Sequence, residues 1–245
     1  PPPPPPPPPR PPPPPRPPPP PPPRFRSRSR HTRLGRWSRG LGDVYKRQPF
    51  VSHFRLAAHL LTAFIICSYI LWLILDLLNN PPRVVTIKSI NTVLWSFTVL
   101  VLIQITFGAF VAGLKAGLFY PTFPLMAGEL IPTQMSVAFA EQGWASWVYD
   151  LTTVQFIHRW LGILILLGTF GLWLNFRPGV PAPDKKSLDT LLIFVVLQTA
   201  LGIITLLYGV PLIPAVLHQI MALFVLLASV WNLHNFKNRY ALAIS

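Results

Sequence analysis

The sequence predicts an all-α polytopic membrane bundle of five transmembrane helices that follows a disordered tail. Three observations predict this fold class. The chain of 245 residues is 51% hydrophobic, and its mean hydropathy is +0.45. Five apolar runs follow residue 50, each long enough to cross ~30 Å of hydrocarbon at ~1.5 Å per residue. The single cysteine excludes a disulfide framework.

Residues 1–50 differ in composition from the rest of the chain. They hold 22 of the 32 prolines and 11 of the 21 Lys and Arg residues. Proline runs form an extended polyproline II helix without an apolar face, so we expect residues 1–23 to be disordered. Residues 24–48 are interpreted as translated non-native sequence or, alternatively, as a native disordered extension. The chain is therefore divided into a low-complexity tail, residues 1–50, and a transmembrane domain, residues 51–245.

The five predicted helices are joined by three short connections and one long one. They span residues 54–77, 90–113, 152–174, 188–209 and 213–235. The long connection, residues 114–151, has Lys115 as its only basic residue, whereas the connections after the first and third helices carry two and three. Because cytoplasmic or matrix loops are enriched in Lys and Arg, we expect the long connection on the outer face. The basic tail would then lie outside as well, which conflicts with the same rule.

Three histidines lie at one expected depth in the bundle. His59, His158 and His218 each sit near the outer end of the first, third and fifth predicted helices, ~8–9 Å below the boundary at ~1.5 Å per residue. A polar side chain at that depth faces protein and has a partner, and two neutral imidazoles on neighbouring helices can hold a heme iron between them. The alternative is that each histidine hydrogen-bonds a neighbouring helix. His234, at the inner end of the fifth helix, is expected to face the headgroups.

An internal repeat supports a shared role for these histidines. The first and fifth helices each carry Ala four residues and Trp thirteen residues after the histidine, and the second and fourth helices each carry Gln four residues before Gly. The repeated positions are His59, Ala63 and Trp72 with His218, Ala222 and Trp231, and Gln104 and Gly108 with Gln198 and Gly202. The pattern predicts repeated helical units, although common membrane residues could produce part of it by chance.

Polar neighbours of the histidines are suited to a porphyrin. Arg55 lies four residues before His59, and Arg159 directly follows His158, so either could pair with a heme propionate. The alternative for Arg159 is snorkelling to phosphate headgroups. Gln155, three residues before His158, could hydrogen-bond a ligand histidine or make an ordinary interhelical bond.

Four segments together resemble the heme A synthase family, and the resemblance covers residues 51–245. They are RLAAHL (55–60), QITFGAFVAGLKAGLFYPTFPLMAGELIP (104–132), VQFIHRWLG (154–162) and AVLHQ (215–219). The resemblance implies eight helices in two four-helix halves, with two histidines for one heme in each half. This chain would supply the last five helices. It has Pro121 where Asn is frequent in the family, and it lacks the loop cysteine pair of some bacterial members.

The resemblance also implies an activity and a set of site residues. Family members oxidise the C8 methyl group of heme O to a formyl group, through an alcohol, and so make heme A for terminal oxidases. By that pattern His158 and His218 ligate the cofactor heme b, and His59 is a catalytic, metal-ligating residue on the substrate side. The second substrate-side histidine and a catalytic glutamate belong to an earlier family helix, so we expect this chain alone to be incomplete and inactive.

Two other functions stay open, together with several predicted partners. A membrane electron carrier needs only the heme b between His158 and His218, and a small transporter could relay protons through histidines, although buried carboxylates are scarce. The predicted partners are heme O, the lipid bilayer, and either heme O synthase or a second copy of the chain. No nucleic acid is expected. The predicted location is the bacterial cytoplasmic membrane, with the mitochondrial inner membrane as the alternative.

Overall fold

Long helices dominate this computed structural model, which describes Pro1 and residues 52–78 and 88–237. Five of its helices are long and apolar enough to cross a membrane. They are α2 (His53–Leu77), α3 (Lys88–Gly113), α6 (Leu151–Phe176), α7 (Ala182–Leu207) and α8 (Leu212–Lys237). No β-strand occurs among the described residues. The predicted all-α fold class with five membrane-spanning helices is confirmed, and the predicted tail lies outside the described residues apart from Pro1.

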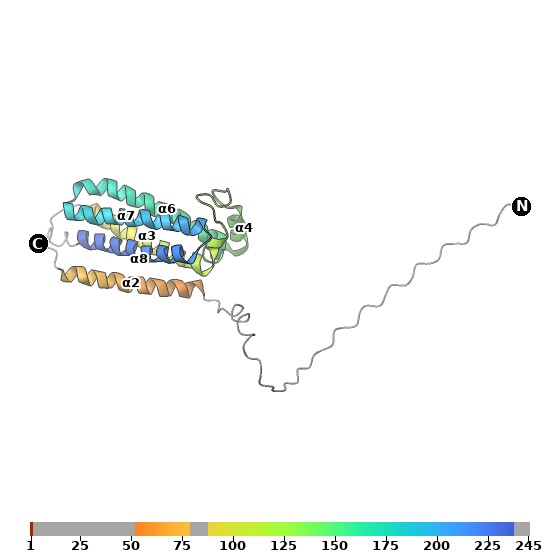
Figure 1. The fold of residues 1–245 in the computed structure, drawn as a ribbon, viewed down its shortest axis with the longest axis horizontal. Coiled ribbons are helices and arrows are strands. Elements are labelled where there is room, and N and C mark those ends of the chain that lie inside the picture. Colours follow the sequence, from red (N-terminus) through yellow and green to blue (C-terminus); the bar gives the residue numbers. More distant parts are fainter. Residues whose placement is uncertain (2–51, 79–87, 238–245) are drawn as a thin grey trace, which may run out of the picture. The chain divides into compact units, whose positions relative to one another are not determined.

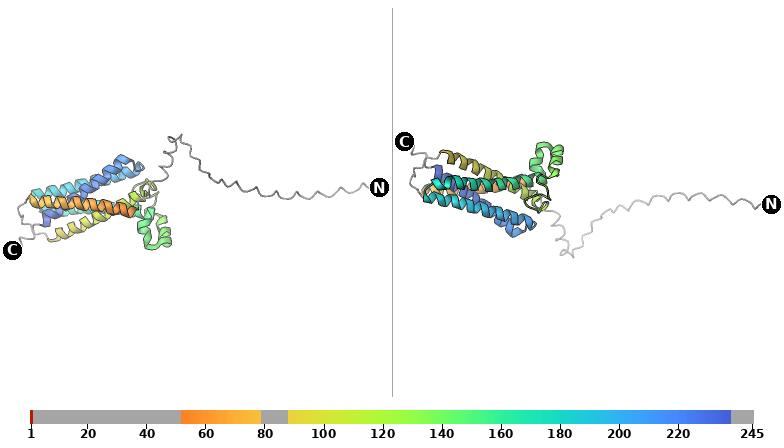
Figure 2. Two further views of the ribbon diagram at one scale, coloured as in Figure 1. Left: turned by 90° about the horizontal axis from the view of Figure 1, so that it is seen from below. Right: turned by 90° about the horizontal axis from the view of Figure 1, so that it is seen from above.

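Four of the long helices form a closed bundle, and α2 packs on its side (Figure 1). Contacts run from α3 to α6, from α6 to α7, from α7 to α8, and from α8 back to α3. The remaining helix, α2, packs against both α3 and α8, and Figure 2 shows it along one side of the bundle. In this order α6 and α8 are diagonal, so their side chains meet only across the interior.

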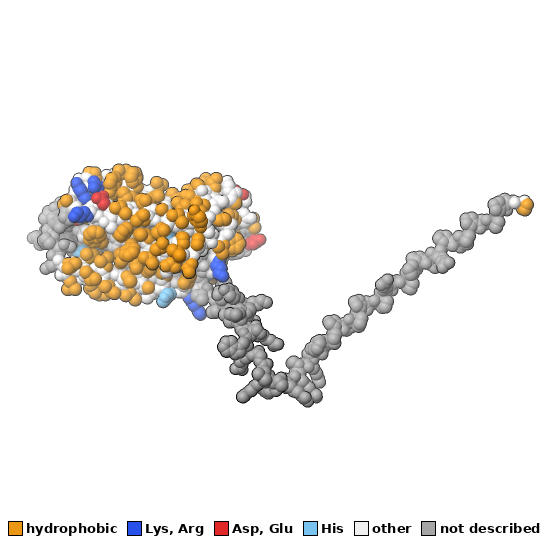
Figure 3. All heavy atoms as spheres, viewed as in Figure 1, with side chains coloured by type: hydrophobic (Ala, Val, Ile, Leu, Met, Phe, Trp, Pro, Cys, Tyr) orange, Lys and Arg blue, Asp and Glu red, His pale blue; other side chains and the backbone are white. Residues whose placement is uncertain are grey.

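Apolar side chains fill the interior and also cover the sides of the bundle. The central core includes Phe64, Phe97, Ile105, Ile165 and Leu226. Figure 3 shows that hydrophobic side chains also dominate the face of the bundle that it draws, with Lys, Arg, Asp and Glu gathered toward the two ends of that face. Each of the five long helices also carries exposed large apolar side chains, which is typical of a helical bundle surrounded by lipid.

The fourth long helix begins earlier than its predicted start at residue 188. α7 starts at Ala182 after an extended Pro181, and Asp184 lies in its first turn. Acidic residues near a helix amino terminus are favoured by the helix dipole. Charges at Asp184, Lys185 and Lys186 lower the hydropathy of this turn, so the apolar pattern alone placed the start too late.

The long connection before α6 is folded rather than open. It contains η2 (Ala116–Leu118), α4 (Thr133–Gln142), η3 (Gly143–Ala145) and α5 (Ser146–Tyr149). Glu129 fixes the start of α4, because its Oε2 accepts a hydrogen bond from the Thr133 backbone N–H at 2.6 Å. Figure 1 places α4 at one end of the bundle. This connection therefore covers the end of the bundle at which α6 begins.

Candidate functional site

Two histidine rings from diagonal helices face each other inside the bundle. The ring centroids of His158 in α6 and His218 in α8 are 6.5 Å apart, and the ring planes cross at 86°. Asp150 caps α6 by accepting a hydrogen bond from the Thr153 backbone N–H at 2.8 Å. The cap fixes where α6 begins and so places His158 about two turns into the helix.

The hydrogen bonds of His218 indicate which of its ring nitrogens carries the proton and which offers a lone pair. Its Nδ1 lies 3.1 Å from the backbone carbonyl of Gln198. A carbonyl oxygen can only accept, so Nδ1 carries the proton and Nε2 presents its lone pair. The side-chain amide nitrogen of Gln198 lies 3.4 Å from that Nε2. Gln198 therefore contacts both ring nitrogens of His218, and its side-chain amide would have to turn away for Nε2 to bind a metal.

His158 has a matching glutamine but a different set of hydrogen bonds. Gln104 of α3 donates from Nε2 to the His158 backbone carbonyl at 3.0 Å. The His158 Nδ1 is buried and has no hydrogen-bond partner among the described residues. Buried polar atoms are normally hydrogen-bonded. An orphaned imidazole nitrogen inside the bundle is consistent with a ring whose role is to bind a ligand.

Arg159 and Gln155 hold the long connection before α6 against that helix. The terminal nitrogens of the buried Arg159 donate to the backbone carbonyls of Thr122 at 2.5 Å, Leu125 at 3.3 Å and Tyr120 at 2.5 Å. Gln155 donates to the same Tyr120 carbonyl at 3.3 Å. Sequence reasoning did not find this contact with the connection. The propionate role of Arg159 and the ligand-partner role of Gln155 stay predictions.

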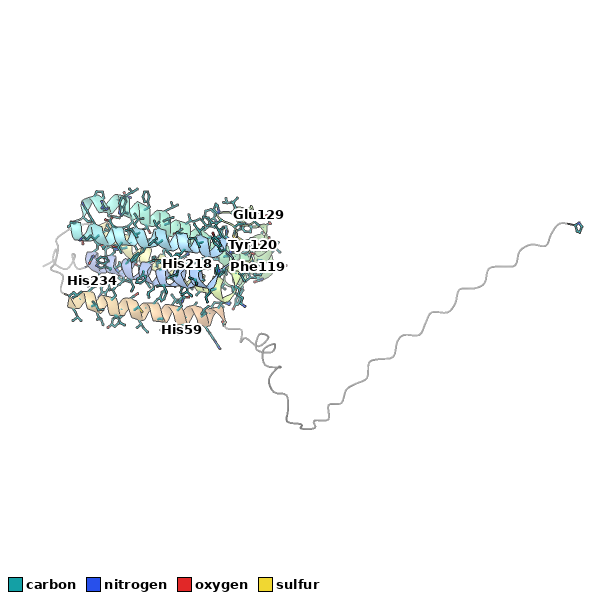
Figure 4. All side chains as sticks on the ribbon, viewed as in Figure 1. His59, Phe119, Tyr120, Glu129, His218 and His234 are labelled. Carbon is teal, nitrogen blue, oxygen red and sulfur yellow. The ribbon has the colours of Figure 1, made fainter. Side chains whose placement is uncertain are left out.

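His59 does not join the histidine pair. It and Arg55 are exposed on α2, whereas the opposite face of α2 buries Ala57 and Phe64. Figure 4 shows His59 on the edge of α2 that is turned away from the other helices, while His218 lies within the bundle. The resemblance assigns His59 to a separate, substrate-side heme, so its separation from the pair leaves its catalytic role a prediction.

The prediction for His234 was wrong. It was expected to face the headgroups, but its side chain is 1% exposed, and its Nε2 lies 2.7 Å from Oδ1 of Asp76 at the end of α2. The Trp72 ring meets it edge-on at 5.0 Å. The physical reason is packing between α2 and α8, which turns both groups toward the interface. Their shared position at the inner ends of two helices was the available signal.

The two histidines suit a metal ion that is already bound by a cofactor. Among the residues that the structure describes, no group of three or more His, Cys, Asp or Glu side chains could hold a metal ion. A porphyrin supplies the four equatorial ligands and leaves two axial positions, which paired imidazoles can fill. With metal–nitrogen bonds of about 2.0 Å and about 1.1 Å from each nitrogen to its ring centre, the two centres would be about 6 Å apart. The observed separation of 6.5 Å between the ring centres is close to this distance.

Comparison with known proteins gives one family. The family profile described as "Cytochrome oxidase assembly protein" matches residues 34–230, so the match begins within the segment predicted to be a tail. A heme A synthase of Wolbachia pipientis subsp. Culex pipiens (strain wPip) is 37% identical over 192 residues, which are 78% of this chain and 56% of that protein. That of Flavobacterium psychrophilum is 36% identical over 190 residues, 77% of this chain and 56% of the relative.

A third relative supports the same assignment. The heme A synthase of Wolbachia pipientis wMel is 40% identical over 184 residues, 74% of this chain and 50% of that protein. The chain spans about half the length of the curated relatives that it matches. No solved structure matches it. With five membrane-spanning helices and a profile match over most of its length, the chain is a multi-pass membrane protein that belongs to the heme A synthase family of cytochrome oxidase assembly proteins.

Proposed function

We propose that the chain forms the heme b half of a heme A synthase in a bacterial cytoplasmic membrane, in which His158 and His218 would hold the heme. The observation that carries this proposal is the 6.5 Å separation of two imidazole centres that face each other from diagonal helices. The curated relatives, which are bacterial heme A synthases, support the reaction class. Heme O is the proposed substrate. Heme O synthase, which would supply it, stays a predicted partner.

The protein's own residues would position the ligands and close the site. The His218 Nδ1–H is held by the Gln198 backbone carbonyl, so Nε2 would be the nitrogen that binds a metal. His158 is held at its backbone by Gln104. Arg159 keeps the connection at residues 120–125 against the outer end of α6, where it limits access of water. A bound heme b would supply one-electron chemistry at its iron, and the protein would tune it through these hydrogen bonds.

The substrate heme is proposed to bind at the face of α2 that is turned away from the other four long helices. Arg55 and His59 are both exposed there, four residues apart on one helical face. His59 would bind the substrate heme, and Arg55 would pair with a propionate. A bis-histidine electron carrier needs neither residue. The relatives' identity as heme A synthases therefore favours the synthase over the carrier.

Ligand substitution tests the assignment. Detergent-purified protein is expected to give the absorption spectrum of a low-spin bis-histidine heme b. His158→Ala and His218→Ala should each remove or greatly weaken it. His59→Ala is the matched control, because it removes an imidazole that does not face the pair, and it should keep the heme b. An unchanged reduced alpha band and heme content in both ligand variants would refute the assignment.

A further inference from the structure

Each of the two facing histidine rings lies against a glycine of the neighbouring helix. A Cβ built on Gly202 of α7 would lie 2.8 Å from Cε1 of His218, and one built on Gly108 of α3 would lie 3.1 Å from Cε1 of His158. In both contacts Cε1 is the nearest ring atom, Nδ1 the next and Nε2 the third. The two rings therefore present the same edge to the two glycines.

Each glycine shares a helical face with the glutamine that contacts the same histidine. Gln104 precedes Gly108 by four residues, and Gln198 precedes Gly202 by four. This spacing puts the glutamine and the glycine of each pair on one face of their helix. One glutamine donates to the backbone of His158, and the carbonyl of the other receives the Nδ1 proton of His218. The Gln–Gly repeat in the sequence thus corresponds to two similar helix surfaces, one on α3 and one on α7, and each packs against one of the two histidines.

We propose that Gly108 and Gly202 are positioning residues that set the orientation of the two imidazole planes. This inference rests on the proposed function only in naming heme b as the group that the rings hold. A side chain at either position would push the ring away from its glycine and turn the free nitrogen from its present direction. The 86° angle between the ring planes would change with it.

The two glycine–histidine contacts differ in how much displacement of the ring they tolerate. At Gly202 the Cβ contact of 2.8 Å is shorter than real Cβ contacts, and the ring is also tied at Nδ1 to the Gln198 carbonyl. At Gly108 the contact is 3.1 Å, and the His158 Nδ1 has no partner among the described residues. The His158 ring can therefore shift by a few tenths of an ångström more easily. We expect Gly202→Ala to have the larger effect.

A double-mutant cycle tests the contact between Gly202 and His218 in the absence of heme. In the heme-free protein, Gly202→Ala should lower thermal stability when His218 is present. In a His218→Ala background the same change should be neutral or stabilising, because alanine is favoured over glycine inside a helix. Equal effects of Gly202→Ala in both backgrounds would overturn the proposal, whether or not the protein binds heme.

The heme-loaded protein gives the second readout. Gly202→Ala is expected to weaken heme retention by roughly tenfold or more, as overpacking of a tight contact does, and to shift the low-spin electron paramagnetic resonance signal, which reports the angle between axial ligand planes. Gly168→Ala on α6 is the matched control, because a Cβ there meets no atom within 4 Å. Gly113→Ala controls for misfolding, since its Cβ would clash at 2.7 Å with His53, outside the pair.

The outcomes separate the two proposals. Retention and a resonance signal equal to those of the parent in Gly202→Ala would overturn the positioning role. The same shift in Gly113→Ala would also overturn it, because the effect would then come from general loosening. A parent protein that keeps its heme in both His158→Ala and His218→Ala would instead overturn the ligand assignment, and the heme-free cycle would still decide whether the glycines seat the rings.

Discussion

Arg159 is expected to be the main support of the long connection before α6, and replacing it should open that segment. Its side chain is 8% exposed, and its guanidinium donates to the carbonyls of residues 120, 122 and 125. A hydrogen bond that involves a charged group contributes about 1.5–3 kcal/mol. Water at the membrane boundary would replace part of the three bonds, so we expect Arg159→Ala to destabilise the closed connection by about 3 kcal/mol.

A buried thiol in the connection measures this opening. Met126 is 2% exposed and belongs to the same connection, so Met126→Cys, made in a Cys67→Ser background, should react slowly with a thiol reagent. Because each 1.4 kcal/mol corresponds to a factor of ten, Arg159→Ala should raise the labelling rate on the order of 100-fold. Arg159→Lys should raise it by roughly tenfold, since a single ammonium cannot reach carbonyls that the planar guanidinium bridges.

The matched control is Arg55→Ala, which removes the same charge from an exposed arginine of α2. It should leave the labelling rate unchanged. A rate within about twofold of the parent in Arg159→Ala would show that the connection is held by other contacts and that the magnitude derived from the three hydrogen bonds is wrong. Equal acceleration by Arg55→Ala would point to net charge rather than to the loop carbonyls.

Three further predictions concern the contact between Asp76 and His234, the membrane topology and the activity of the chain. Asp76→Ala and His234→Phe should each lower the free energy of unfolding by about 1–3 kcal/mol, with a double variant well below additivity because both remove one contact; thermal unfolding measures this, and full additivity would contradict it. Cysteines at the exposed positions Ser136 and Lys186 should label from opposite sides of oriented vesicles, and same-side labelling would contradict the topology. Expressed alone in a strain that lacks its own synthase and is supplied with heme O, the chain should hold heme b but form no heme A; heme A that disappears with His59→Ala would refute this.

The apolar pattern predicted the helices well because membrane helices are defined by length and hydropathy. The pattern was less accurate where the first or last turn of a helix contains charged residues. α7 begins at Ala182 rather than at residue 188, since a turn that projects beyond the hydrocarbon has no need to be apolar. The helix α4, with the sequence TQMSVAFAEQ, was absent from the prediction because a short polar segment has no membrane signature.

The candidate site was predictable in its residue types and less so in its contacts. Shared depth singled out His59, His158 and His218, the resemblance paired the last two, and the structure brings those two rings together. The Gln–Gly repeat was visible in the sequence, but its role as a ring seat depends on the contact between neighbouring helices. The pairing of Asp76 with His234 spans 158 positions in the chain, so the only signal was that both residues lie at the same expected end of their helices.

The outward direction of His59 follows from the internal repeat. His59 and Trp72 in α2 correspond to His218 and Trp231 in α8, so α2 is the counterpart of α8 rather than an added fifth wall of the same bundle. His218 points into the bundle that α8 helps to form. By the same rule His59 should point into the interior of the other four-helix half that the resemblance implies, and that interior would lie on the far side of α2. A histidine and an arginine left in hydrocarbon are costly, which is the physical reason to expect protein or porphyrin on that face. The exposed position of His59 is thus the arrangement expected of a helix shared between two heme-binding halves.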